Sequence, residues 1–137
     1  MTGLVVCVAV LAAASVYGVL HGRRSGRVRV RGRDDGRRLE AERLGGALGE
    51  RATLVQFSSA FCAPCRATRR ILGEVAGVVP GVAHIEIDAE ARLDLVRELD
   101  ILKTPTVLVL DAEGRVVRRA TGQPRRADVI AALGEAV

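Results

Sequence analysis

Two cysteines, Cys62 and Cys65, are separated by two residues and are the side chains of this 137-residue chain best suited to covalent chemistry. At this spacing the two sulfurs can bond across a single helical turn, so the pair can cycle between a dithiol and a disulfide. The pair stands between an apolar run, residues 53–57, and a helix-like run, residues 67–79. The pattern therefore predicts a redox-active disulfide at the point where a strand leads into a helix.

The expected helix start favours Cys62 as the reactive sulfur. Unpaired N–H groups and the positive end of the helix dipole stabilise a thiolate at such a position. Cysteines placed in this way can have a pKa lowered to roughly 3.5–7.5, from about 8.5. Ala63 and Pro64 open the helix, and proline suits a first turn because it needs no N–H partner there. Arg66 adds a nearby cation.

A metal site is the alternative use of the same cysteines. Zinc sites often begin with Cys-x-x-Cys, but they need further Cys or His ligands. This chain offers Cys7, within an apolar segment, and two histidines, His21 and His84, that are far apart in the sequence. In this alternative, Cys62, Cys65 and His84 hold the ion and the protein is a non-enzymatic binding module, whereas the redox interpretation needs no metal.

The N-terminal segment carries no charged residue between Gly3 and Leu20. A helix of this length spans about 27 Å at ~1.5 Å per residue, close to the ~30 Å thickness of a bilayer's hydrocarbon core. A secretory signal peptide has basic residues before its apolar core, whereas here they all follow it. A helix that is apolar on every side otherwise needs a very large protein core. We therefore expect residues 3–21 to form a single transmembrane anchor.

Residues 22–37 are rich in Arg and Gly and are expected to form a juxtamembrane linker. Between Gly22 and Arg38 lie eight arginines and only two aspartates, in a chain whose formal net charge is +5. Each such arginine is attracted to anionic headgroups by about 1 kcal/mol, and short basic loops stay on the cytoplasmic side. No aromatic residues are interleaved for base stacking, so we expect membrane contact and no nucleic-acid partner. The remaining domain is expected to be cytoplasmic.

Residues 38–137 are expected to form one α/β domain with the element order α-β-α-β-α-β-β-α. This order mixes parallel crossovers with an antiparallel hairpin, which predicts a central mixed sheet flanked by helices. The expected helices are residues 39–48, 63–79, 89–99 and 125–136, and the expected strands are residues 53–57, 82–88, 107–110 and 115–120.

This domain resembles the thioredoxin family over about residues 38–137. The matching features are a cysteine pair after a strand, a Thr-Pro pair about forty residues later, a hairpin turn and a glycine, namely Cys62-Ala63-Pro64-Cys65, Thr104-Pro105-Thr106, Asp111-Ala112-Glu113-Gly114 and Gly122. The resemblance implies a thioredoxin fold, here preceded by the transmembrane helix, and thiol–disulfide oxidoreductase activity of the protein-disulfide reductase type. It further implies a cis peptide bond before Pro105, and a substrate surface that includes Phe61, Thr104, Pro105 and Gly122.

The resemblance and thiol chemistry together imply a two-step exchange. Cys62 attacks a substrate disulfide to form a mixed disulfide, and Cys65, less exposed and one turn further along, attacks Cys62 and releases the reduced substrate. The implied partners are disulfide-containing proteins and a flavin-dependent thioredoxin reductase as electron donor, with no cofactor beyond the cysteine pair and a monomeric chain. An outward-facing domain would instead serve extracytoplasmic thiols in cytochrome c maturation or oxidative folding.

Several residues depart from the family's pattern. Phe61 stands where a tryptophan is usual, and Ala63 replaces the glycine of the usual Gly-Pro pair. Gln56 falls at the position of the family's buried aspartate, and it cannot act as a general base. His84 falls at the position of the partner lysine, with Glu86 on the same face of its strand. We therefore consider a proton relay through His84 and Glu86, with a purely structural Gln56–His84 hydrogen bond as the alternative.

Overall fold

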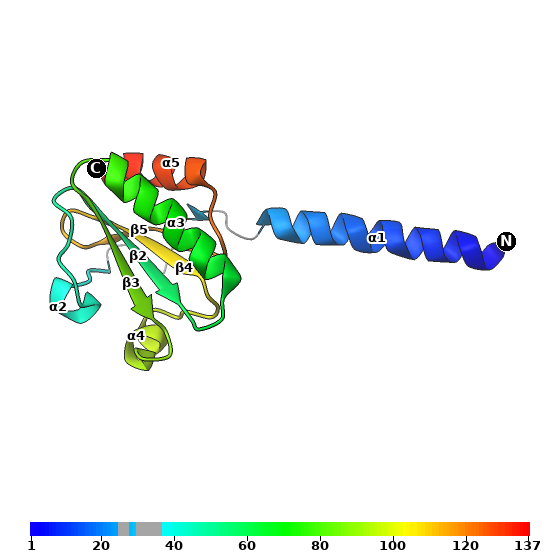
Figure 1. Ribbon diagram of the computed structural model, residues 1–137, viewed down its shortest axis with the longest axis horizontal. Helices are drawn as coiled ribbons and strands as arrows, with labels where there is room; N and C mark the ends of the chain where they lie inside the picture. Colours follow the sequence, from blue (N-terminus) through cyan, green and yellow to red (C-terminus); the bar gives the residue numbers. More distant parts are fainter. Residues whose placement is uncertain (25–27, 30–36) are drawn as a thin grey trace.

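A computed structural model of the chain describes residues 1–24, 28–29 and 37–137. The N-terminal helix α1 (Thr2–Arg24) stands outside an α/β domain that contains all the other elements (Figure 1). Every described side chain from Thr2 to Gly22 is exposed, and this stretch is long and apolar enough to cross a membrane. Most of the predicted linker, residues 25–27 and 30–36, lies outside the described residues.

The domain is built on a five-stranded mixed sheet in the order β1-β5-β4-β2-β3. Its strands are β1 (Val28–Arg29), β2 (Ala52–Ser58), β3 (Val82–Asp88), β4 (Thr106–Asp111) and β5 (Val116–Thr121). β2 and β3 are parallel, and the other neighbours are antiparallel. The predicted mixed sheet with flanking helices is confirmed, and the sheet gains β1 from within the predicted linker.

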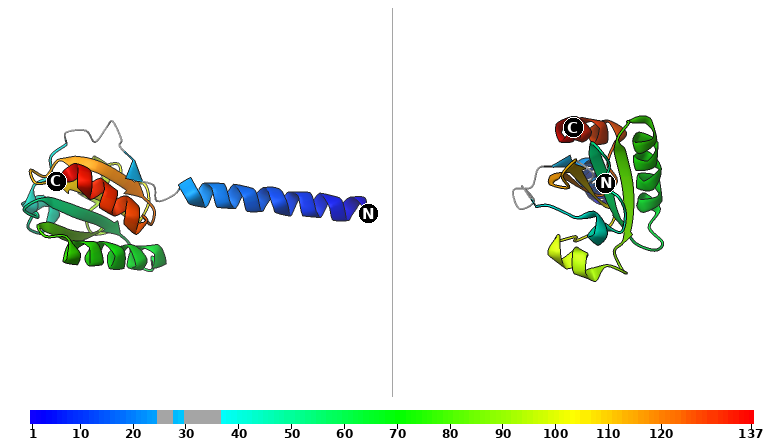
Figure 2. Two further views of the ribbon diagram at one scale, coloured as in Figure 1. Left: turned by 90° about the horizontal axis from the view of Figure 1, so that it is seen from above. Right: turned by 90° about the vertical axis from the view of Figure 1, so that its left-hand side faces the viewer.

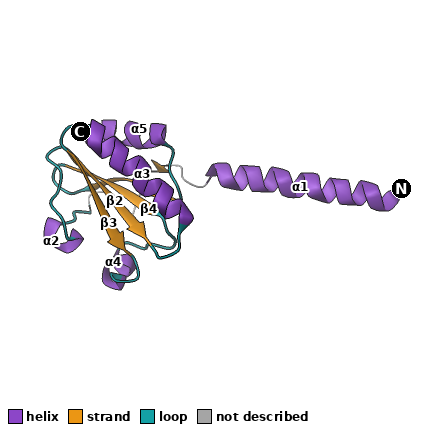
Figure 3. Cartoon of the chain, in the orientation of Figure 1, coloured by secondary structure: helices purple, strands orange, loops and turns teal. Residues whose placement is uncertain are grey.

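Helices cover both faces of this sheet (Figures 2 and 3). They are α2 (Ala41–Leu44), α3 (Ala63–Val78), α4 (Leu93–Glu98) and α5 (Arg126–Ala136). Residues of α3 and α5 pack with one set of strand side chains, which includes Leu54, and residues of α2 and α4 pack with the other set, which includes Val55 and Phe57. Because side chains alternate along a strand, Gln56 lies on the same face as Leu54, under α3.

Two helices are shorter than the sequence predicts. The helix expected at residues 39–48 is reduced to α2, because Gly45 takes a left-handed conformation (φ 74°) that ends it. The helix expected from residue 89 begins only at Leu93. Before it, the Asp88 carboxylate accepts a hydrogen bond from the N–H of Glu90 at 2.9 Å, a side-chain turn that competes with helix formation.

Candidate active site

The two cysteines lie where β2 leads into α3. Cys62 is the N-cap residue of α3 and is half-buried, whereas Cys65 is 1% exposed. They form a disulfide with an S–S distance of 2.12 Å and a Cα–Cα distance of 5.2 Å. Cys62 Sγ also accepts a hydrogen bond from the backbone N–H of Cys65 at 3.2 Å. After reduction, the same N–H can stabilise a Cys62 thiolate, since hydrogen bonds to the charged form favour it.

Exposed apolar residues flank Cys62 in the sequence, and another precedes Thr104 in the loop before β4. Phe61 is fully exposed and has a φ of 57°, an unusual conformation for an aromatic residue. Ala63 and Pro64 on the other side of Cys62 are also exposed. Leu102, which precedes Thr104 by two residues, is 83% exposed. We call Phe61, Ala63, Pro64 and Leu102 the apolar rim.

The loop before β4 brings Thr104 to the cysteine pair. Its hydroxyl lies 4.0 Å from Cys62 Sγ, as a long hydrogen-bond donor, and 2.8 Å from the hydroxyl of Ser59. The Thr104–Pro105 peptide bond is cis, as the family resemblance implies. The carbonyl of Pro105 accepts a hydrogen bond from the N–H of Gly122 at 2.8 Å. The loop after β2, the loop before β4 and the end of β5 therefore meet at one end of the strands. We call this end of the sheet the active-site edge.

Gln56 connects His84 to the second cysteine. The buried amide nitrogen of Gln56 donates to the carbonyl of Cys65 at 2.8 Å and to the hydroxyl of Ser58 at 2.9 Å. Since both amide hydrogens are used, the amide oxygen is the acceptor for His84 Nε2, which lies 3.1 Å away. This arrangement places a proton on Nε2 of His84. The imidazole therefore meets an amide oxygen rather than a sulfur atom.

Burial lowers the pKa of His84, and this effect exceeds the opposing influence of Glu86; Arg69 lowers the pKa further. The Glu86 carboxylate accepts two hydrogen bonds from the Arg69 guanidinium, at 2.5 and 2.7 Å. This ion pair raises the pKa of Arg69. Glu86 thus bonds to α3, and it acts on His84 through its charge.

Several contacts near the site escape prediction from sequence. Arg69 pairs with Glu86 only because α3 packs across β3. Arg119, buried in β5, donates to the carbonyls of Leu99 and Asp100 at 2.6 and 3.2 Å, and so it holds the end of α4. An alternating strand pattern with an arginine at an inward position is the one signal that could have indicated the role of Arg119.

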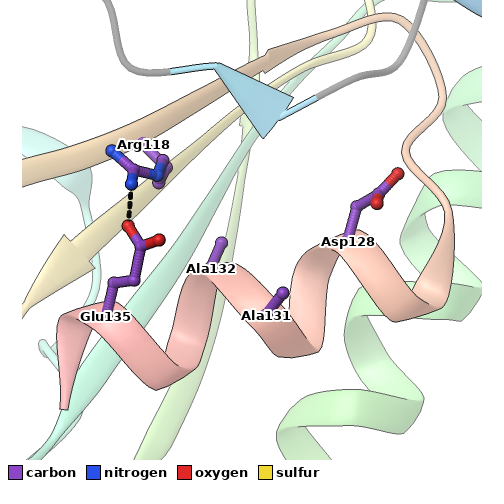
Figure 4. A pocket seen from close by; sticks show the side chains of 5 residues that line it. All are labelled: Arg118, Asp128, Ala131, Ala132 and Glu135. Carbon is purple, nitrogen blue, oxygen red and sulfur yellow. Dashed lines mark ion pairs between the residues drawn. The ribbon is translucent and has the colours of Figure 1, made fainter.

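A pocket between β5 and α5 is separate from the cysteine chemistry. It is lined by Arg118, Asp128, Ala131, Ala132 and Glu135, and Arg118 forms an ion pair with Glu135 across it (Figure 4). The lining contains neither a cysteine nor a histidine. Within the described part of the chain, no three or more His, Cys, Asp or Glu side chains are grouped so as to hold a metal ion.

A cysteine pair that caps a helix behind a central strand, opposite a cis-proline loop, defines a thiol–disulfide redox site. The family profile for thioredoxin matches residues 46–135, so the chain belongs to the thioredoxin family. It is a thioredoxin-type oxidoreductase, and its homologues imply disulfide-containing protein substrates.

Curated relatives and solved structures agree with this assignment. Over 87 residues the chain is 30% identical to a thioredoxin of Mycolicibacterium smegmatis, covering 61% of this chain and 77% of the relative. It is 34% identical over 68 residues to thioredoxin domain-containing protein 2 of Homo sapiens, which covers 50% of this chain and 12% of that protein. Two solved structures share the fold: thioredoxin f from spinach chloroplast (TM-score 0.57, 24% identity, 64% of this chain and 78% of that one) and mitochondrial thioredoxin 3 from Saccharomyces cerevisiae (0.55, 16%, 63% and 79%).

Proposed function

We propose that this protein is a membrane-tethered reductase of protein disulfides. The observation that carries the proposal is the pairing of a half-exposed Cys62 with a buried Cys65 within bonding distance. The Cys62 thiolate attacks one sulfur of the substrate disulfide, so that a Cys62–substrate bond forms, the substrate S–S bond breaks and the departing thiolate takes up a proton. The Cys65 thiolate then attacks Cys62 Sγ, which restores the internal disulfide and releases the second substrate thiol.

Substrate contacts are assigned to the residues around Cys62. The apolar rim offers surface for the side chains that flank a substrate disulfide. Thr104, Pro105 and Gly122 form the backbone against which an extended substrate segment can pair. Two electrons leave the protein in each cycle. A flavin-dependent thioredoxin reductase returns these electrons. The protein acts as a monomer, needs no cofactor beyond the cysteine pair and has no nucleic-acid partner.

Helix α1 is proposed to be the tether. Its exposed apolar surface and its length support a position across the lipid bilayer. The arginines follow the apolar stretch rather than precede it, which supports a membrane anchor with the domain on the cytoplasmic side. In a reducing cytoplasm the pair would act as a reductase.

Two measurements test this proposal. The reduced full-length protein in detergent should reduce insulin, and Cys62→Ser should abolish the reaction; an active Cys62→Ser variant would refute the mechanism. In intact cells, a membrane-impermeant thiol reagent should leave Cys62 unlabelled. Labelling from outside would support instead an extracytoplasmic role in cytochrome c maturation or oxidative folding.

A further inference from the structure

Strand β1 determines where the chain enters the domain after α1. It pairs antiparallel with β5, with Val28 opposite Ala120 and Arg29 opposite Arg119. It also lies against α5. The domain is thus held at β1, whose last residue, Arg29, is eight positions before Arg37, the next described residue.

The paired end of β5 is the end that carries the active site. Ala120 lies two residues before Gly122, whose N–H bonds to the carbonyl of Pro105. Thr104, joined to Pro105 by the cis bond, lies 4.0 Å from Cys62 Sγ through its hydroxyl. The other end of β5 lies about 14 Å further away, at ~3.4 Å per residue. Val28 is therefore bound at the active-site edge.

The connection between α1 and this edge is short. Four residue steps separate Arg24 from Val28, and a fully extended chain covers at most about 14 Å over this length. From Gly22, the last residue of the apolar stretch, the six steps to Val28 cover at most about 21 Å. Figure 1 shows β1 and the start of α3 at the end of the domain that faces α1.

Building on the proposed function, we propose that the active-site edge faces the bilayer and that the substrates are disulfides of membrane-anchored proteins, close to their membrane-spanning segments. A tether attached at the opposite edge would instead present Cys62 to soluble proteins. The apolar rim suits such a partner, because Phe61 and Leu102 are large apolar side chains that are exposed to solvent. The reaction remains the two-step exchange, with two electrons passing from the cysteine pair to the partner's disulfide.

The test uses the reduced full-length protein in vesicles of phosphatidylcholine and phosphatidylglycerol. Two single-span peptides are the substrates: one has a disulfide loop directly after its span, and the other has the same loop at the end of a long Gly/Ser spacer. Insulin is the soluble substrate. One variant carries a Gly/Ser insertion of about 20 residues after Ser25, upstream of β1. The matched control carries the same insertion after Asp34, downstream of β1.

We expect the near-membrane loop to be reduced faster than the distant loop. The upstream insertion should slow reduction of the near loop by about 15-fold, since effective concentration falls roughly as the −3/2 power of tether length and the tether grows from about 4 to about 24 residues. The downstream insertion should change this rate by less than about twofold, because β1 still holds the active-site edge in place.

Equal rates on the two loops, or equal effects of the two insertions, would overturn the inference. A near loop that is reduced slowly in vesicles but rapidly in detergent would also overturn it, since lipid would then cover the apolar rim. Insulin separates this inference from the proposed function. All three proteins should reduce insulin at similar rates, and failure of the unmodified protein to do so would refute the reductase itself.

Discussion

Replacing the buried Gln56 with leucine should destabilise the domain by about 2–4 kcal/mol. The amide makes three hydrogen bonds, to Ser58, Cys65 and His84, and leucine can make none of them. The carbonyl of Cys65 lies in α3 and can still accept a hydrogen bond within the helix. Losing the hydrogen bond from Gln56 therefore costs about as much as one ordinary hydrogen bond, about 0.5–1.5 kcal/mol. The imidazole of His84 is only half-buried and can form a hydrogen bond with water in place of Gln56. The hydroxyl of Ser58, only 5% exposed, is left without its Gln56 partner at a cost of about 1–3 kcal/mol.

Urea denaturation of the oxidised protein measures this change as a shift in the unfolding midpoint at constant slope. The double variant Gln56→Leu/Ser58→Ala is the matched control, because removing both partners of a buried hydrogen bond costs much less than removing one. The double variant should recover at least about 1 kcal/mol of the loss. A change below about 1 kcal/mol for Gln56→Leu, or a double variant less stable than the single one, would show that these contacts do not hold the site together.

Further outcomes are expected at His84, Phe61, Gly49 and Gly73. Folding lowers the pKa of His84, so the unfolded chain binds a proton at His84 more readily than the folded protein does. The free energy of unfolding should therefore fall as the pH drops below about 6.5, and it should level off below the pKa of His84 in the folded protein. The His84→Gln variant should lack this dependence. In a relay, His84→Ala also alters the pH profile of the reduction rate, and an unchanged profile means a purely structural His84. Phe61→Ser should raise KM for insulin by at least about 10-fold, since burying the ring contributes about 1.5–3 kcal/mol, without slowing a small disulfide. Gly49→Ala should destabilise strongly in urea, because its Cβ would lie 2.1 Å from the carbonyl of Ala52, whereas Gly73→Ala, with open space in α3, should stabilise by about 0.5–1 kcal/mol.

Sequence patterns predict this fold well wherever the determinants are local. Apolar runs bounded by turns located β2, β3 and the β4–β5 hairpin, and Pro64 after Cys62 located the start of α3. The length of α2 was overestimated, because the apolar spacing continues through Gly45 whereas its left-handed backbone ends the helix. Here a single backbone conformation outweighs side-chain periodicity.

Contacts between distant elements could not be read in the same way. The alternation of Arg and Val around β1 is typical of a strand. Its partner β5, however, is separated from it in the sequence by nearly the whole domain, so the pairing cannot be predicted from local pattern. The Gln56–His84 hydrogen bond is the exception: it was one of the two expectations drawn from the family's pattern, and the structure contains it. The parallel register of β2 and β3, in which Leu54 is opposite His84, brings the two side chains together. The ion pair of Arg69 with Glu86 depends on how α3 crosses the sheet, and sequence spacing does not specify this.

One direct experiment tests which of the two sulfurs attacks the substrate disulfide. Reduced Cys65→Ser protein is incubated with insulin and the products are weighed by mass spectrometry, with Cys62→Ser as the matched control. Cys62 is half-buried and caps α3 while Cys65 is covered, so Cys65→Ser should accumulate a covalent adduct through Cys62 and the control should form none. An adduct formed by Cys62→Ser instead, or by neither variant, would contradict Cys62 as the attacking sulfur.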